Sequence, residues 1–317
     1  MSVLPHEKPI YDCQDTINQL KEQNKSNDIW SKDEITKLEK KLDFLKKKVY
    51  SSLTSWDRIL ISRHPQRPRS IDYLKNIFDE YEEISGDRLF RDDKSIITAF
   101  VKADGKKFIF IGQEKGNDTE TRLYRNFGMP HPEGYRKALR AMKLAEKFSL
   151  PIICMLDTPG AYPGLAAEER GQGWAIAKNL FEMSRLKTQI IIVLIGEGCS
   201  GGALGIGIGD KIGMMEHAYY SVISPEGCAS ILFKDPNKNS IAAEALKIHA
   251  EHLKKIKVID KIIKEPIGGA HLDPIIAYEN VKNFILYAYE DLKNIALNTL
   301  IDKRYSKFRD IGEFTKQ

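Results

Sequence analysis

Residues 190–205, IIIVLIGEGCSGGALG, decide the fold class of this chain. The apolar run at 190–195 indicates a buried strand, and the glycine-rich run at 196–205 follows it and leads into small and apolar residues that can begin a helix. A strand that ends at glycines before a helix is typical of α/β proteins, whose ligands collect beyond the carboxyl ends of the strands. We therefore expect a ligand site at this turn.

Strands and helices alternate on either side of that turn. Residues 96–101 and 108–111, joined by Asp104-Gly105, predict a β-hairpin. Periodicity then predicts, in order, a helix over 135–148, a strand over 152–156, a helix over 169–186 and, near the end of the chain, a helix over 275–295. This order predicts right-handed crossovers in a layered α/β structure.

The N-terminal part is expected to differ from the rest. We predict that residues 1–70 form a helical segment and a basic linker that contact a partner, and that residues 71–317 form the main domain. A capping box at Ser31 and Glu34 precedes an apolar stripe, which consists of Ile35, Leu38, Leu42, Leu45 and Val49. The stripe fits a helix laid on the main body as well as a surface for a partner subunit.

The basic segment at 63–69 reads RHPQRPR. Its two prolines break any helix, and its three arginines are crowded into one extended stretch. Two interpretations stay open: a linker that closes the first domain, or an arginine cluster that meets phosphates or an acidic partner.

A second glycine-rich turn, DTPGAYPG at 157–164, follows the strand predicted at 152–156. Glycines at a strand-to-helix turn allow backbone N–H groups to point outward, and the helix start adds a partial positive charge. At 196–205 the product is an oxyanion hole, with Gly201, Gly202 and Ala203 as the candidate donors. One such donor contributes about 2.7–4 kcal/mol to a transition state.

Other sites compete with this hypothesis. Residues 198–202, GCSGG, match the nucleophile elbow of serine hydrolases and would make Ser200 a nucleophile, with its base among His217, His249, His252 and His271. A nucleotide site is disfavoured, because DTPG imitates the D-x-x-G of GTPases without any G-x-x-x-x-G-K-[ST], and the glycines at 205–209 lack the order of a dinucleotide loop.

Composition excludes several classes of protein. No apolar run approaches the roughly 20 residues of a membrane span, and the first ten residues lack the apolar core of a secretion signal, so we expect a cytoplasmic protein. The net charge of +5 suits an anionic substrate but does not call for nucleic acid. We expect no metal site and buried free thiols, because the four cysteines, Cys13, Cys154, Cys199 and Cys228, are scattered.

Four strings in order resemble the carboxyltransferase alpha subunit of bacterial acetyl-CoA carboxylase. They are RNFGMPHPEGYRKALR (125–140), DTPGAYPG (157–164), GEGCSGGALGIGIGD (196–210) and SPEGCASIL (224–232). The resemblance extends over nearly the whole chain and includes RHPQRPR. It implies a crotonase-like fold of the ClpP/crotonase type, a β-β-α superhelix over residues 71–317 that carries carboxyltransferase activity, preceded by an N-terminal helical segment.

The same resemblance implies a function. With a beta subunit, in an α2β2 assembly, the chain would transfer the carboxyl group of carboxybiotin, borne by the biotin carboxyl carrier protein, to acetyl-CoA. The product would be malonyl-CoA, in the first committed step of fatty acid biosynthesis. ATP would be used by a separate biotin carboxylase, and the family's zinc ribbon belongs to the beta subunit.

Site residues follow from the resemblance. It assigns the backbone amides of Gly201 and Gly202 to the carbonyl oxygen of biotin, and we expect further biotin contacts from Gly160, Ala161, Tyr162, Gly198 and Ser200. Two positions depart from the family, which commonly has glycine in place of Cys199 and alanine in place of Gly205. The alternative function is a crotonase-fold serine hydrolase that uses Ser200, and a non-enzymatic role of the lysine-rich N-terminal segment in a nucleic-acid or scaffold contact is a third.

Overall fold

The computed structural model describes residues 3–27 and 31–312. Within them the centre is an eight-stranded sheet in the order β1-β2-β3-β4-β5-β6-β8, with β7 paired to β5. The strands are β1 (Glu80–Glu83), β2 (Ile96–Ala103), β3 (Lys106–Gln113), β4 (Ile152–Thr158), β5 (Ile190–Cys199), β6 (Lys211–Met215), β7 (Tyr219–Ser221) and β8 (Lys261–Ile263).

The sheet is mixed. Strands β1, β2 and β3 pair antiparallel, and β3, β4, β5, β6 and β8 pair parallel. The predicted hairpin is confirmed as β2 and β3, with Ala103 opposite Lys106 across a turn in which Asp104 and Gly105 both have positive φ. All residues of β4 and β5 are buried, as their apolar sequences predict for central parallel strands.

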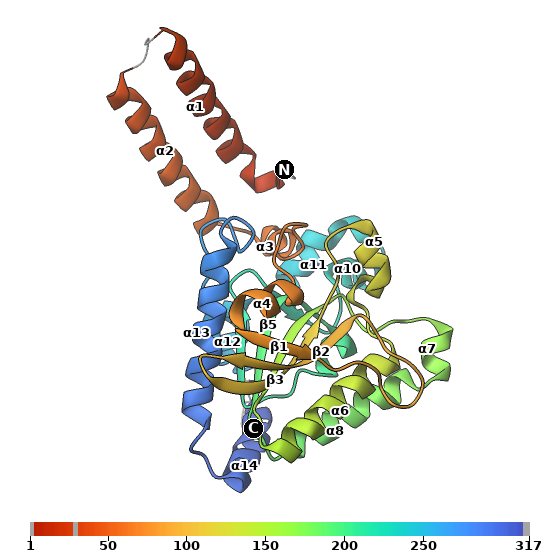
Figure 1. Ribbon diagram of the computed structural model, residues 1–317. Coiled ribbons are helices and arrows are strands. Elements are labelled where there is room, and N and C mark those ends of the chain that lie inside the picture. Colours follow the sequence, from red (N-terminus) through yellow and green to blue (C-terminus); the bar gives the residue numbers. More distant parts are fainter. Residues whose placement is uncertain (1–2, 28–30, 313–317) are drawn as a thin grey trace, which may run out of the picture.

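Helices cover both faces of the sheet (Figure 1). On one face, Phe110 of β3 packs edge-to-face on Phe78 at the end of α4, and Phe108 packs on Tyr289 of α13. Helix α6 packs on β2 and β3 from the other face, and α8 packs on α6. The helices that follow the N-terminal hairpin along the chain are α3 (Ser55–Ser62), α4 (Ser70–Ile77), α5 (Thr119–Tyr124), α6 (Pro132–Phe148), α7 (Leu165–Glu169), α8 (Gln172–Arg185), α9 (Ser200–Leu204), α10 (Pro225–Phe233), α11 (Asn239–Leu246), α12 (Ala250–Lys255), α13 (Pro274–Leu292) and α14 (Leu297–Arg309).

The alternation read from the sequence is confirmed with one break. Helices α6 and α13 and strands β4 and β5 match their predicted ranges closely. The predicted helix at 169–186 is wrong at its start, because α7 ends at Glu169 and α8 begins only at Gln172. Gly171 between them has a φ of 81°, a left-handed conformation that ends a helix.

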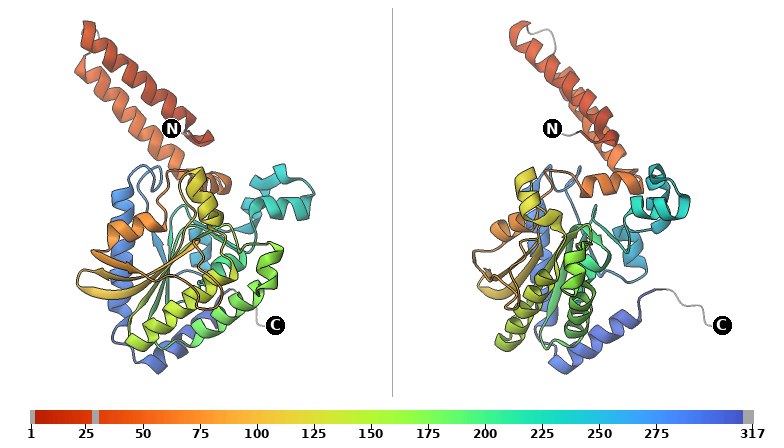
Figure 2. Two further views of the ribbon diagram at one scale, coloured as in Figure 1. Left: turned by 45° about the vertical axis from the view of Figure 1, so that its right-hand side comes forward. Right: turned by 90° about the vertical axis from the view of Figure 1, so that its right-hand side faces the viewer.

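An antiparallel helical hairpin stands away from the sheet (Figures 1 and 2). It consists of α1 (Lys8–Asn27) and α2 (Lys32–Ser51), which pack against each other. The capping box at Ser31 is confirmed. The apolar stripe of α2 thus has a partner that neither interpretation named, the helix α1. Ile17 of α1 and Leu42 of α2 are both buried. No helix in the described part of the chain is long and apolar enough to cross a membrane.

Candidate active site

The two glycine-rich turns meet at the carboxyl ends of β4 and β5. These strands are parallel neighbours, so the residues that follow them lie at one edge of the sheet. A Cβ atom built on Gly202 would lie 2.4 Å from the carbonyl carbon of Gly160 and 2.6 Å from the nitrogen of Ala161. Backbone therefore packs directly on backbone, and position 202 has no room for a side chain.

Helix α9 presents unpaired donors beside this contact. Cys199 is its N-cap and makes no side-chain capping bond. In the part of the chain that the structure describes, the N–H groups of Gly201 and Gly202 donate to no acceptor. Ser200 and Gly201 are partly exposed, whereas Gly202 and Ala203 are buried. The start of α9 can therefore donate hydrogen bonds to an oxygen that approaches from the exposed side.

The other turn is held in shape by short-range bonds. Gly160 has a φ of 148°, in the region that favours glycine, and its N–H donates to Thr158 Oγ1 at 3.1 Å. Tyr162 donates its N–H to the carbonyl oxygen of Pro130 at 3.0 Å and stacks on His131, with ring centroids 4.3 Å apart. The shape of this wall is thus set by residues of two of the strings quoted above, at 125–140 and 157–164.

The remaining predicted contact residues are placed differently. Gly198 is buried in β5, and a Cβ there would lie 2.7 Å from Leu194 Cδ2 and 2.9 Å from Tyr220 Cδ2. Its glycine therefore serves close packing in this structure. Ala161 and Tyr162 are partly exposed beside α9. The assignment of any of them to biotin stays a prediction.

Ser200 has the backbone of an elbow but not the partner of a nucleophile. Its φ is 56°, which is uncommon for a residue with a side chain. Among the described residues, no histidine forms a hydrogen bond with its hydroxyl. His271 stacks on His64, His217 donates its backbone N–H to Glu265, and His249 is the N-cap of α12 without a side-chain capping bond, so none of these contacts directs an imidazole at Ser200. The hydrolase alternative therefore lacks its base.

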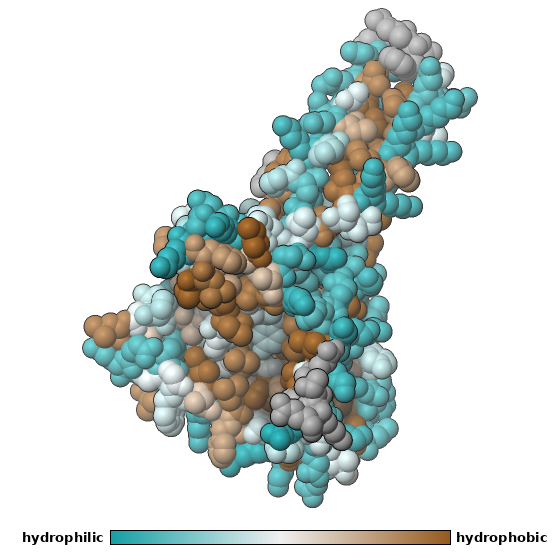
Figure 3. Space-filling model, turned by 180° about the vertical axis from the view of Figure 1, so that it is seen from behind, coloured by the Kyte–Doolittle hydropathy of each residue, from teal (hydrophilic) through white to brown (hydrophobic). Residues whose placement is uncertain are grey.

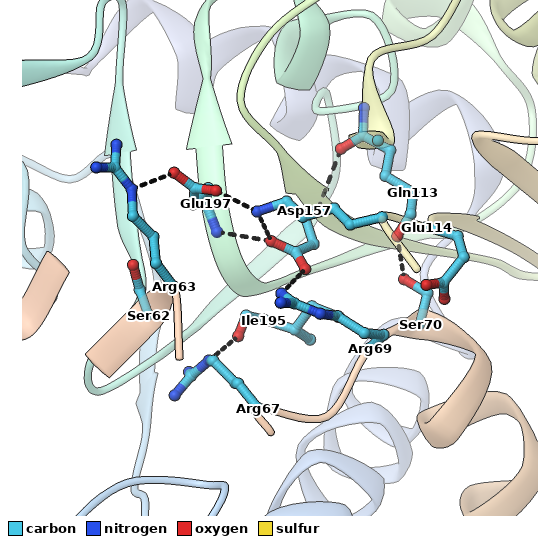
Figure 4. Close-up of polar contacts among 12 residues, drawn as sticks. Ser62, Arg63, Arg67, Arg69, Ser70, Gln113, Glu114, Asp157, Ile195 and Glu197 are labelled. Carbon is cyan, nitrogen blue, oxygen red and sulfur yellow. Dashed lines mark hydrogen bonds and ion pairs between the residues drawn. The ribbon is translucent and has the colours of Figure 1, made fainter. Parts of the chain in front are cut away.

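Two arginines of the basic segment bind residues near the carboxyl ends of β4 and β5 (Figure 4). Arg67 donates from Nε to the carbonyl oxygen of Ile195 at 2.9 Å and forms a two-pronged ion pair with Glu265, with both N–O distances 2.7 Å. Arg69 pairs with Asp157 at 3.0 Å. Both arginines are buried, so their guanidinium groups are not available to phosphates or to a partner, and the assignment of this segment as a linker stays a prediction.

Asp157 is the centre of this cluster. Its Oδ1 accepts from the N–H of Glu197 at 2.9 Å and pairs with Lys115 at 2.7 Å, while Oδ2 pairs with Arg69. The regular pairing of β4 and β5 shifts after Leu156, and the carboxylate satisfies the backbone donor left at that shift. A Cβ at Gly196 would lie 2.5 Å from Asp157 Oδ1, so Gly196 makes room for the carboxylate.

Glu197 extends the cluster toward the surface. It pairs with Lys115 and, at 2.7 Å, with Arg63, and it accepts from the hydroxyl of Tyr219 at 2.7 Å. Burial by itself would raise the pKa of Glu197, but Lys115 and Arg63 outweigh it and hold the pKa well below its usual range. Glu197 therefore stays ionised. Sequence reasoning missed this cluster, although acidic residues just after apolar strands and three close arginines were its signals.

The main cavity lies apart from both glycine-rich turns. A cavity of about 520 Å³ at the base of the helical hairpin is lined by residues that include Tyr11, Tyr50 and His271, and by none of either glycine-rich turn. Three cysteines are buried free thiols and Cys13 is partly exposed, which corrects the expectation for that residue. Within residues 3–27 and 31–312, no group of three or more His, Cys, Asp or Glu side chains is arranged to hold a metal ion.

Known proteins resemble this chain over nearly its whole length. The family described as acetyl co-enzyme A carboxylase carboxyltransferase-like matches residues 3–312. The acetyl-coenzyme A carboxylase carboxyl transferase subunit alpha of Chlamydia pneumoniae is 61% identical over 312 residues, covering 98% of this chain and 96% of that one. The protein of the same name from Protochlamydia amoebophila is 60% identical over 314 residues, covering 99% of each.

Solved structures share the fold at low identity. Transcarboxylase 12S with hydrolysed methylmalonyl-coenzyme A superposes with a TM-score of 0.58 at 17% identity, over 83% of this chain. This chain spans 46% of that one, less than half of its length. A Pseudomonas malonate decarboxylase hetero-tetramer in complex with coenzyme A superposes with a TM-score of 0.52 at 14% identity, over 66% of this chain and 84% of that one. The expected crotonase-like α/β fold is confirmed.

Proposed function

The chain belongs to the family of acetyl-CoA carboxylase carboxyltransferase alpha subunits, and on that premise we propose that it supplies the carboxybiotin half of a site that a beta subunit completes. The observation that carries this proposal is the pair of unpaired N–H groups at Gly201 and Gly202, at the start of α9 and beside the turn at 157–164. The activity is transfer of a carboxyl group from carboxybiotin to acetyl-CoA.

The chain contributes backbone electrostatics. Bound carboxybiotin would supply the carboxyl group as carbon dioxide and then a base for the proton of the acetyl methyl group, and the resulting enolate would take up that carbon dioxide to give malonyl-CoA. The amides of Gly201 and Gly202 donate to the urea oxygen of carboxybiotin, where negative charge develops as the carboxyl group leaves. Because these donors are fixed before the reaction, each contributes about 2.7–4 kcal/mol to the transition state and little to the ground state. No side-chain base is needed from this chain.

The buried ion pairs anchor the strand ends from which the two glycine-rich turns begin. Arg69 and Asp157 fix the end of β4, and Arg67 fixes Ile195 in β5, five residues before Ser200. Both glycine-rich turns thus start from anchored strand ends. A site built on backbone amides depends on such anchoring, since no rotamer change can correct a misplaced peptide.

An exposed hydrophobic face supports a partner subunit. Figure 3 shows a broad hydrophobic area on the side opposite to the view of Figure 1, below the helical hairpin. Helices α7, α8 and α10 and the loop before α10 expose large apolar side chains, which include Leu165 (75% exposed), Trp174, Val222 (81%), Ile231 and Leu232. Large apolar side chains that are exposed together on a surface favour binding of a protein partner. We place the beta subunit there, in an α2β2 assembly that the biotin carboxyl carrier protein visits and that a separate biotin carboxylase supplies with ATP-derived carboxybiotin.

The N-terminal part extends the same proposal. We propose that residues 1–70, with the projecting α1–α2 hairpin, contact a partner, and that the reaction takes place in the cytoplasm. Exposed lysines on α2, which include Lys40, Lys41 and Lys48, keep this hairpin polar outside its packed seam.

The test is reconstitution with the beta subunit. The chain is co-purified with the beta subunit, and malonyl-CoA-dependent carboxylation of free biotin is measured for each chain alone and for the complex. We expect transfer only from the complex. Full turnover by this chain alone would show that its site is complete and would contradict the proposal.

A further inference from the structure

Gln113 forms hydrogen bonds with residues of both glycine-rich turns. It is the last residue of β3 and is fully buried. Residues alternate across a strand, and a Cβ at Gly112 would face Ser70 and Phe110, so the Gln113 side chain points to the opposite face, toward α9. Figure 4 shows it beside Asp157.

Both ends of the Gln113 amide are used, in opposite roles. Its Oε1 accepts from the backbone N–H of Asp157 at 3.2 Å, and its Nε2 donates to the carbonyl oxygen of Gly202 at 2.7 Å. Since one neighbour can only donate and the other can only accept, a side-chain amide in one orientation satisfies both. Neither an aliphatic side chain nor a carboxylate does so.

The Gly202 carbonyl depends on this bond. In a continuing α-helix it would accept from the N–H of Ile206, but that N–H donates to Ala203 at 3.3 Å. The Tyr135 hydroxyl is its second donor, at 3.3 Å, and burial raises the pKa of Tyr135 well above its usual value, so this hydroxyl stays protonated. Two side chains thus replace the missing backbone bond and fix the peptide between Gly202 and Ala203.

We propose that Gln113 is a positioning residue of the carboxyl-transfer site. Its side chain holds the start of α9 at a fixed position relative to the end of β4. The inference rests on the proposed function, because it is the amides of this turn that Gln113 would hold in place. Without the bond from Gln113, the Gly202 carbonyl keeps only the longer bond from the Tyr135 hydroxyl, and the contacts of the one-turn helix α9 with the turn at 157–164 are backbone packing.

The closing experiment replaces Gln113 by glutamate. A protonated carboxyl group reproduces the amide, with its carbonyl accepting from Asp157 and its hydroxyl donating to Gly202, whereas the carboxylate places negative charge against the Gly202 oxygen. Burial raises the pKa of such a carboxyl group. The ionisable side chains near it include those of Arg69, Glu114, Lys115, Tyr135, Asp157 and Glu197.

Kinetics of the assembled complex are measured for wild type, Gln113→Glu and Gln113→Met. We expect kcat of Gln113→Glu to rise about tenfold relative to wild type as the pH is lowered from about 8.5 to about 6, as the acid form returns. For Gln113→Met we expect kcat to fall by about 10²-fold at every pH, with the KM for malonyl-CoA within about twofold of wild type.

Asn179→Asp is the matched control. The Asn179 amide is also buried and donates to two carbonyl oxygens, those of Tyr135 at 3.0 Å and Gly205 at 2.9 Å, without touching Gly202 or Asp157. Its complex should keep the wild-type shape of the pH profile. The same profile in Asn179→Asp as in Gln113→Glu would overturn the inference, because any buried acid would then suffice.

Other outcomes would also overturn the positioning role of Gln113. A Gln113→Glu profile identical to wild type, or a Gln113→Met complex with near-wild-type kcat, overturns the positioning role. Failure of both Gln113 variants to assemble with the beta subunit overturns it too, since Gln113 would then serve folding alone. Failure of the proposed function is distinct: the wild-type complex itself would show no transfer.

Discussion

Gly202 packs on Gly160 so closely that a Cβ at position 202 would lie 2.4 Å from the Gly160 carbonyl carbon. Backbone packs directly on backbone here and holds the two glycine-rich turns together, one from β4 and one from β5. A side chain at 202 would therefore alter packing and catalysis at once. Gly201 differs, because its Cβ would meet only Ile176, at 3.4 Å.

Gly202→Ala and Gly201→Ala should separate these two effects. We expect Gly202→Ala to destabilise the chain by about 1–3 kcal/mol, as overpacking does, and to reduce transfer. Gly201→Ala keeps its backbone N–H and lies in a helix, so we expect unchanged folding and transfer within a few-fold of wild type. Thermal midpoints and transfer rates of both complexes are the measurements. Equal effects of the two substitutions would show that the contact with Gly160 does not matter.

Ser200→Ala should leave transfer within a few-fold of wild type, because the hydroxyl has no catalytic partner in the described structure. The Ser200 φ of 56° also means that Ser200→Gly should relieve backbone strain and raise the thermal midpoint. Transfer assays and reaction with a fluorophosphonate probe are the measurements. Labelling of the wild type that disappears in Ser200→Ala would revive the hydrolase hypothesis.

Arg69→Met should destabilise the chain by about 3–5 kcal/mol, because it leaves the buried carboxylate of Asp157 without one of its partners. Adding Asp157→Asn removes that charge, so we expect the double variant to lose less than the sum of the two single variants. Urea unfolding of the four proteins gives the coupling energy. Strict additivity would mean that Arg69 and Asp157 do not act as a pair.

The Arg67–Glu265 pair should make stability depend on pH. Burial alone would raise the pKa of Glu265, but attraction and hydrogen bonds from Arg67 lower it from 4.5 to about 2. A carboxyl group with a depressed pKa stabilises the fold above its unfolded value, and this stabilisation is lost as the pH falls from about 4.5 toward about 2.

Urea midpoints at about pH 6 and about pH 3 check this expectation. Wild type should lose more stability between the two than Glu265→Gln, which has no carboxyl group to protonate at that position. If Glu265→Gln loses as much stability as wild type, the acid sensitivity comes from groups other than Glu265.

Much of the fold was predictable, because local patterns and tertiary structure agree there. The strands β4 and β5 are apolar throughout, and the turn at Asp104 and Gly105 has the residues that a tight hairpin requires. Residues 1–70 were expected to be helical, but the bounds of helix α1 were not predicted, because few of its residues form an apolar stripe; it depends on packing against α2.

The site was predictable only in part. Glycine patterns and the family resemblance point to Gly201 and Gly202, since special backbone geometry is visible in the sequence. The contacts of Arg69 with Asp157 and of Gln113 with Gly202 join residues about ninety positions apart. No local periodicity reports such pairs, and only the parallel order of β3, β4 and β5 brings them together.

The central claim is that the amides of Gly201 and Gly202 hold the oxygen of biotin. A crystal structure of the complex with the beta subunit and biotin tests it most directly. We expect the biotin urea oxygen to lie about 2.7–3.1 Å from both backbone nitrogens, the range of an oxyanion hole. Biotin bound with its urea oxygen away from the start of α9, or held by side chains of this chain instead, would contradict the account.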